Sequence, residues 1–123
     1  MSYAVNETKD LPRPAAEVLA AADAILDQLG AKRSTKPPVV EGQLQAEFNK
    51  QVGGRAFTNR VQLTLRVVDG GSDRCTATVD AYPIDPLGKP LRFGVLGQPA
   101  RLVTTAFWER LEARLSSVAA AER

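Results

Sequence analysis

One cysteine, Cys75, is the only thiol of the chain, and histidine is absent. A catalytic thiolate needs a neighbouring base or a helix N-terminus to lower its pKa, and the usual base is missing here. Cys75 also shares an alternating row with Ala77 and Val79, which predicts an inward position on a strand. We therefore interpret Cys75 as a small buried apolar residue. The same counts exclude Ser-His-Asp catalysis, histidine-ligated metals and internal disulfides.

Charged residues offer a second possible chemistry. Glu47, Arg66 and Asp80 fall at the polar positions of three successive alternating stretches. Paired carboxylates in a cleft could perform acid–base catalysis, whereas on an open sheet the same residues form a cross-strand charge ladder. We favour the ladder, because nothing in the sequence predicts a concave site around them.

A basic, glycine-containing segment superficially suggests a phosphate loop. Gly53-Gly54-Arg55 is flanked by Lys50 and Arg60. The Gly-Lys-Ser/Thr ending of such loops is missing, and no predicted helix follows that could direct its N-terminus at an anion. The segment is more typical of a basic hairpin tip.

The aromatic pair Phe107-Trp108 could line a ligand groove. Phe107 lies within a helical apolar stripe and Trp108 lies just beside it. Aromatic residues at helical spacing usually serve packing, so a core position is the alternative interpretation.

The first quarter of the chain predicts a strand and a helix. Residues 3–8 alternate weakly, as a short strand does. Proline at position 14 suits the first turn of a helix over 14–29, which carries the apolar stripe Val18, Ala21, Ala22, Ile25 and Leu29. Gly30 is a typical left-handed stop. The basic stretch 31–36 predicts a short edge strand protected by its charges.

Four further stretches alternate apolar and polar residues, as strands with one covered face do: 42–49, 61–67, 75–81 and 89–96. Turn signals separate the last three, at Asp69-Gly70-Gly71 and at Asp85-Pro86-Leu87-Gly88. Consecutive hairpins require an antiparallel sheet. After Pro99, helical spacing returns in Val103, Phe107, Leu111, Leu115 and Val118.

These elements predict a single α+β domain over residues 1–123, with residues 116–123 expected to fray. Its antiparallel sheet of five to six strands packs on an N-terminal helix and a longer C-terminal helix. The order of elements is β-α-β-β-β-β-β-α.

This order resembles the START-like polyketide cyclase/dehydrase superfamily and its helix-grip fold. The N-terminal strand, the helix entry Leu11-Pro12-Arg13-Pro14-Ala15-Ala16-Glu17-Val18, the meander and the long last helix carry the resemblance. It implies a groove between sheet and C-terminal helix that holds a lipid, sterol or polyketide. No catalytic residue follows from it.

Composition limits the partners. Sixteen basic against fourteen acidic residues give a net charge of +2, too weak by itself to indicate nucleic acid or an anionic membrane. Outward strand positions hold Gln, Thr, Arg and Asp instead of the stacking aromatics that nucleic-acid binding needs. No stretch is long and apolar enough for membrane insertion. The unpaired cysteine and the lack of a secretory signal at the N-terminus favour a cytoplasmic location.

Three functions remain open. The first is a non-catalytic domain that binds a small apolar molecule, without a cofactor or metal, in a groove between sheet and last helix. Candidate groove residues are Leu44, Phe48, Leu63, Leu65, Phe93, Phe107, Trp108 and Leu111. The second is a protein-interaction or self-associating module that uses a sheet edge or the polar face. An enzyme is the least favoured, because histidines and metal ligands are missing.

Overall fold

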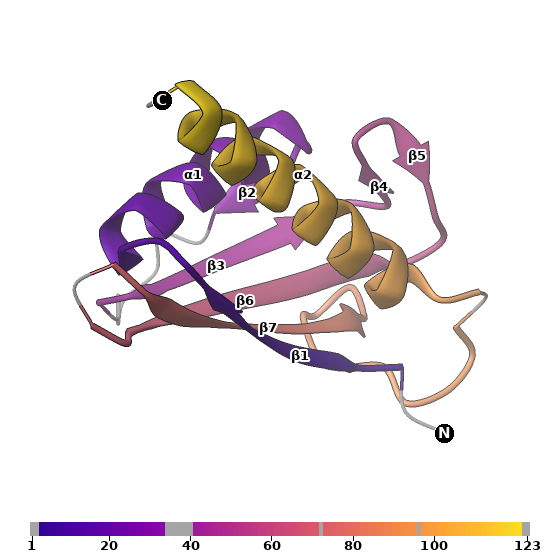
Figure 1. Cartoon of the computed structure of the whole chain (residues 1–123). Helices are drawn as coiled ribbons and strands as arrows, with labels where there is room; N and C mark the ends of the chain where they lie inside the picture. The colour runs from indigo at the N-terminus through magenta and orange to yellow at the C-terminus, as the bar shows by residue number, and fades with distance from the viewer. Residues whose placement is uncertain (1–2, 34–40, 72, 96, 122–123) are drawn as a thin grey trace.

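Two helices cover one face of a five-stranded antiparallel sheet in the computed structural model of the chain (Figure 1). The structure describes residues 3–33, 41–71, 73–95 and 97–121. The elements along the chain are β1 (Val5–Leu11), α1 (Ala15–Gln28), β2 (Lys32–Arg33), β3 (Gln43–Phe48), β4 (Gln51–Val52), β5 (Arg55–Ala56), β6 (Arg60–Asp69), β7 (Cys75–Ile84) and α2 (Pro99–Ala121). The predicted α+β class and the antiparallel sheet are confirmed.

The strands of the main sheet lie in the order β1-β7-β6-β3-β2, and every neighbouring pair is antiparallel. The N-terminal strand therefore lies beside the last strand, at one edge. The short basic strand β2 forms the other edge, as predicted for 31–36, of which 34–36 lie outside the described residues. Strands β4 and β5 form a separate hairpin with Gly53-Gly54 at its tip, which confirms the interpretation of that segment.

The core lies between the sheet and the helices. Alternation places the apolar rows of β3, β6 and β7 on the covered face, and these rows are buried together with the apolar stripes of α1 and α2. The buried set includes Val61, Leu63, Leu65 and Val67 from β6 and Cys75, Ala77, Val79 and Ala81 from β7. The sequence thus predicts correctly which face of these strands is covered.

Helix α1 begins and ends where its sequence signals predict. Pro14 is the N-cap residue in extended conformation, and its fixed φ and missing N–H suit a helix start. Gly30 follows the helix with a φ of 85°, a left-handed conformation that is costly for residues with a side chain.

The predicted strand over 89–96 is wrong. The segment makes only an isolated bridge, from Pro90 to Ile84, before the chain leaves the sheet. Pro90 has no N–H to donate to a strand ladder, and Gly94 has a φ of 80°, outside the strand region. Phe93, expected to point inward, is therefore 82% exposed on a loop.

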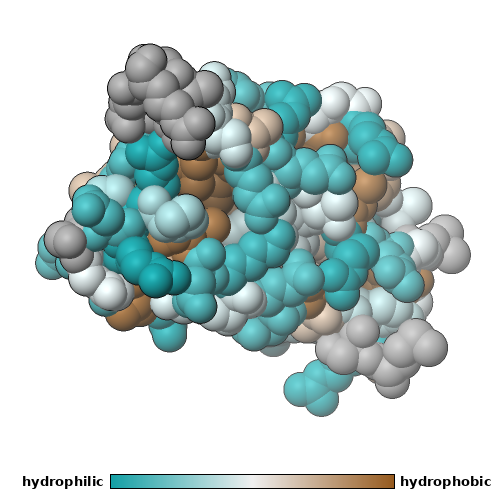
Figure 2. Space-filling view, in the orientation of Figure 1, coloured by the Kyte–Doolittle hydropathy of each residue, from teal (hydrophilic) through white to brown (hydrophobic). Residues whose placement is uncertain are grey.

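The two terminal elements differ in extent from their predictions. Strand β1 runs to Leu11, beyond the predicted 3–8, and so includes part of the stretch taken as the helix entry. Helix α2 has helical backbone to Ala121, through most of the stretch expected to fray. Among the described residues no helix is long and apolar enough to cross a membrane. Figure 2 shows mostly polar side chains on the visible face, with apolar residues in the gaps between them.

Candidate functional site

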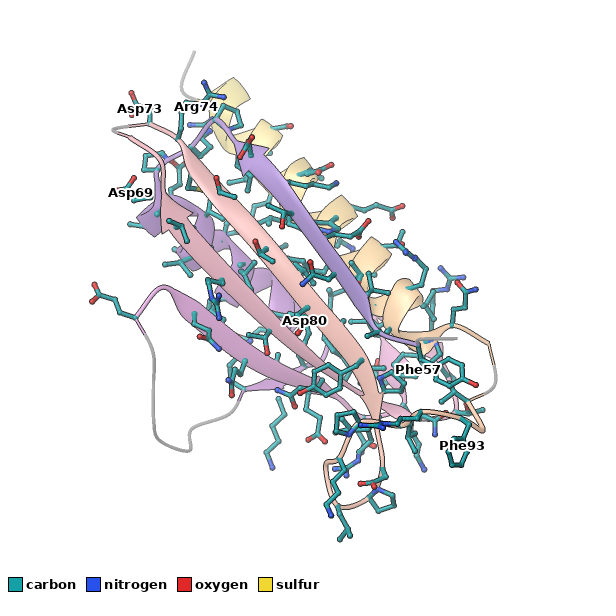
Figure 3. All side chains as sticks on the ribbon, turned by 90° about the horizontal axis from the view of Figure 1, so that it is seen from below. Phe57, Asp69, Asp73, Arg74, Asp80 and Phe93 are labelled. Atoms are coloured by element: carbon teal, nitrogen blue, oxygen red, sulfur yellow. The ribbon has the colours of Figure 1, made fainter. Side chains whose placement is uncertain are left out.

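The candidate groove residues separate into a core group and one outlier, Phe93. Five of them are fully buried between the sheet and the helices: Phe48, Leu63, Leu65, Phe107 and Leu111. Trp108 is 4% exposed and joins the same cluster, and Leu44 packs against its margin. Phe93 lies on the exposed loop, away from this cluster (Figure 3). The structure therefore brings together the predicted residues except Phe93.

Trp108 is the one residue of this group with an unmet polar requirement. Its indole Nε1 is buried, and no described residue accepts a hydrogen bond from it. The ring centroid lies 5.6 Å from that of Phe107, at an interplanar angle of 58°. On its other side the Lys9 ammonium lies 4.8 Å from the ring centroid, in cation–π range. Trp108 therefore lies where α2 passes above β1.

Two charged residues of β1 point toward the helical layer, a feature that the sequence analysis missed. Glu7 and Lys9 lie opposite Val79 and Ala77 of β7, on the covered face. Lys9 Nζ is 2.7 Å from Glu112 Oε1, and Arg101 Nη1 is 3.2 Å from Glu7 Oε2. These ion pairs let charged side chains at the sheet edge reach solvent along α2. The sequence could have predicted this direction, because the alternation of β1 places Glu7 and Lys9 on the same face as Val5 and Leu11.

Strand β7 presents only small side chains to α2. Cys75, Ala77, Val79 and Ala81 form its buried row. Burial raises the pKa of the Cys75 thiol above its usual value, and the Asp69 carboxylate raises it further. Cys75 is thus a neutral, inert thiol, and its interpretation as a buried apolar residue is confirmed.

Two open hollows lie beside the loop that follows β7, on the polar face of the sheet that carries Asp80 and Tyr82. The larger, of about 580 Å³, is lined by Tyr3, Asp80, Tyr82, Leu91 and Arg92, among others. The smaller, of about 340 Å³, lies between Lys50, Arg60, Ile84 and Leu91. The polar side chains that line the two hollows reach solvent. Water can therefore satisfy their hydrogen bonds, unlike that of the buried Trp108 N–H.

The predicted ladder of Glu47, Arg66 and Asp80 is not formed. Arg66 lies opposite Gln43 and Thr78, and Asp80 lies opposite Thr64, so no two of the three face each other. Glu47 Oε1 instead accepts a 2.7 Å hydrogen bond from Arg60, which also donates to the Asp85 carbonyl. Within the described ranges no group of three or more Cys, Asp or Glu residues could hold a metal ion.

Two of the solved structures that match this chain are described by their similarity to it. DynU16, a protein in the dynemicin biosynthetic locus, matches with a TM-score of 0.51 and 19% identity, over 94% of this chain and 48% of that one. A START superfamily protein from Mycobacterium smegmatis matches with a TM-score of 0.47 and 12% identity, over 98% and 99% of the two chains. No protein-family model and no curated protein matches the sequence.

The chain spans about half the length of DynU16. At 19% identity the likeness concerns the fold and not the ligand. The order of strand, helix, antiparallel strands and long final helix agrees with the order predicted from the sequence. The chain therefore has the helix-grip-like layout that its sequence resembles, and it shares its fold with DynU16.

Proposed function

We propose that this chain is a non-catalytic binding domain that holds a small, mainly apolar molecule between the sheet and α2, beside Trp108. One observation carries the proposal: the indole N–H of Trp108 is buried, and none of the residues that the structure describes accepts a hydrogen bond from it. A buried donor without a partner costs about 1–3 kcal/mol. A bound molecule that supplies a carbonyl or phenolic oxygen would remove that cost.

The surroundings of Trp108 favour an apolar molecule with a single polar end. Phe107 and Leu111, its neighbours on α2, are fully buried, as is Val79 in the strand below. The Lys9 ammonium over the indole ring adds positive charge on the side of β1. A flat or elongated apolar body with an oxygen directed at Trp108 suits this combination.

In this proposal α2 moves to admit the molecule, because the described residues between the sheet and α2 pack in one cluster. Neither of the two hollows described on the polar face lies between the sheet and α2, and the residues there pack against one another. The small side chains Ala77 and Ala81 of β7 are the part of the sheet over which a shifted helix would leave space. The ion pairs of Lys9 and Arg101 are partly exposed and therefore weak, so they oppose this shift little.

Trp108 is the only tryptophan, so its fluorescence reports on the site directly. Anthraquinone-2-sulfonate, with fused rings and carbonyl acceptors, is a suitable probe. We expect saturable quenching of Trp108 emission at one probe per chain. Calorimetric titration of the Trp108→Phe variant should show roughly tenfold weaker affinity, since about one hydrogen bond is lost.

A matched control separates this site from the exposed apolar loop. The double variant Leu87→Ser/Phe93→Ser removes two side chains that are 83% and 82% exposed and leaves the interface intact. It should bind the probe as the wild type does. Equal affinity in wild type and Trp108→Phe, or loss of binding in the loop variant, would overturn the proposal.

Protein interaction remains a second candidate function, favoured by the same loop. Leu87 and Phe93 are both exposed on it, whereas most large apolar residues described in the chain are covered. Exposed apolar side chains grouped on one loop are typical of interaction sites. If the loop is an interaction site, the Leu87→Ser/Phe93→Ser variant should no longer bind a protein partner but should still bind the probe.

A further inference from the structure

The two edges of the sheet differ in how they resist pairing with another strand. Edge strand β2 has two residues within the described part of the chain, both basic, and short length and positive charge are common protections of an edge. Edge strand β1 has seven residues and no proline or bulge. Among the described residues only β7 pairs with it, so its outer edge offers unpaired backbone groups.

The sequence of β1 is complementary to itself when read in the opposite direction. In an antiparallel pair centred on Thr8, Val5 lies opposite Leu11, Asn6 opposite Asp10, and Glu7 opposite Lys9. From this we infer that β1 pairs with β1 of a second copy of this chain about a two-fold axis at Thr8. The product is a dimer with one continuous ten-stranded sheet. This inference shares Lys9 with the proposed ligand site, but it rests on the unpaired edge of β1 and on the order of its charges and not on ligand binding.

Charge complementarity argues for a second copy and against other strands. Charged side chains that point toward the covered face normally prevent edge pairing. Here Glu7 and Lys9 retain side-chain exposures of 36% and 38%. In the two-fold pair Glu7 of each copy lies opposite Lys9 of the other copy, which gives two pairs of opposite charges. Arg101 and Glu112 already contact them, so each half of the interface becomes a row of four alternating charges.

The helices leave space for this pairing. Helix α2 packs chiefly over β7, the second strand from the edge, and less over β1. With strands about 4.8 Å apart, the two copies of β7 lie about 14 Å apart across the dimer. Helices pack at about 8–10 Å, so the two copies of α2 do not collide. The partly exposed ion pairs of Arg101 with Glu7 and of Glu112 with Lys9 lie between the two copies of α2.

Cysteine cross-linking tests the position of the axis. Thr8→Cys should form an intermolecular disulfide under mild oxidation by oxidised glutathione, because directly opposite residues have Cα atoms about 4.5–5.5 Å apart. Thr78→Cys is the matched control, since Thr78 lies opposite Thr8 on the same face, one strand further from the axis. Its two copies lie too far apart to bond. Native Cys75 is 2% exposed and should not react.

Charge reversal tests the pairing itself, by light scattering coupled to gel filtration. The wild type should have twice the chain mass of 13.2 kDa at tens of micromolar. Glu7→Lys and Lys9→Glu alone place like charges opposite each other and should shift the chain to the monomer. The double variant Glu7→Lys/Lys9→Glu restores opposite charges between copies and should restore the dimer.

The double variant separates pairing from a role within the chain. It places a lysine near Arg101 and a glutamate near Glu112, so ion pairs that acted only within one copy would be worse than in either single variant. Arg55→Glu, at the exposed tip of the small hairpin, controls for net charge and should stay dimeric. A monomeric wild type, a dimer insensitive to both single reversals, or equal cross-linking of the Thr8→Cys and Thr78→Cys variants would overturn the inference.

Discussion

Helix α1 packs on β3 and β6 with apolar side chains, whereas α2 packs on β7, β6 and β1 through an interface that includes an indole N–H and two charged strand residues. The buried residues of α1 are Val18, Ala21, Ala22, Ile25 and Leu26. Both helices cover the same face of one sheet. The two interfaces therefore differ in the chemistry of their side chains and not in the solvent exposure of the sheet. Among the described residues the Trp108 N–H is the buried side-chain polar group without a partner, and it lies in the α2 interface, whereas Arg33 beside α1 is paired with Asp23 and Asp27.

This contrast assigns adaptability to the part of the α2 interface around Trp108 and β1, whereas α1 and the buried row Val103, Phe107 and Leu111 of α2 supply stability. Apolar packing loses free energy whenever it opens, because every contact is lost to water. An interface with an unsatisfied N–H and partly exposed ion pairs loses less when it opens, and it gains when a ligand supplies an acceptor. The following predictions test this contrast in order of decreasing effect.

The largest effect is expected under α1. Leu26→Ala removes a fully buried side chain and should lower the free energy of unfolding by about 2–5 kcal/mol. Urea denaturation followed by circular dichroism measures it. A loss below about 1 kcal/mol would show that α1 is not the tightly packed half.

A smaller effect is expected at Trp108. Trp108→Phe loses packing contacts, but it also removes the unpaired N–H, and the two changes act in opposite directions. The free energy of unfolding should fall by less than about 1.5 kcal/mol in the same urea experiment. A loss as large as that of Leu26→Ala would contradict the contrast between the helices.

The ion pairs that attach each helix to its edge strand provide a third comparison. Arg33 of β2 contacts Asp27 at 2.5 Å and Asp23 at 3.1 Å, with a side chain 23% exposed. Arg33→Ala should cost about 1 kcal/mol, and Glu112→Ala, whose pair with Lys9 is more exposed, less than about 0.5 kcal/mol. Both losses should shrink in about 1 M NaCl. Equal losses would mean that the two attachments are equally strong.

The smallest effect concerns Cys75 at high pH. Its pKa is raised in the folded chain by burial and then by Asp69, so the folded state favours the neutral thiol. The resulting stability is complete below the unfolded pKa and is lost as pH rises through the folded value. Unfolding curves between about pH 8 and 10.5 should therefore show a steeper alkaline loss in the wild type than in Cys75→Ala. Identical slopes would show that burial does not protect this thiol.

Periodicity alone predicted most of the fold, because each strand with one covered face has a two-residue repeat and each helix an apolar stripe. The alternation over 61–67 and 75–81 identified both the strands and their buried faces. The same rule failed at 89–96, where Leu91, Phe93 and Val95 alternate as in a strand. There the backbone limits of Pro90 and Gly94 outweigh the side-chain pattern.

The candidate site was only partly predictable, because its distinctive features depend on tertiary contacts. The apolar residues around Trp108 follow from helical spacing. The inward direction of Glu7 and Lys9 is acceptable only because Arg101 and Glu112, from the far end of the chain, lie above them. The missing acceptor of Trp108 is likewise a property of the packed structure.

The indole N–H of Trp108 can be observed directly, since a ¹⁵N-labelled chain gives a single tryptophan side-chain resonance in a ¹H–¹⁵N spectrum. We expect this proton to resonate upfield in the free protein, as an N–H without a hydrogen bond does. On titration with anthraquinone-2-sulfonate it should move downfield and saturate at one equivalent. A resonance that stays in place through saturating probe would contradict the proposed site.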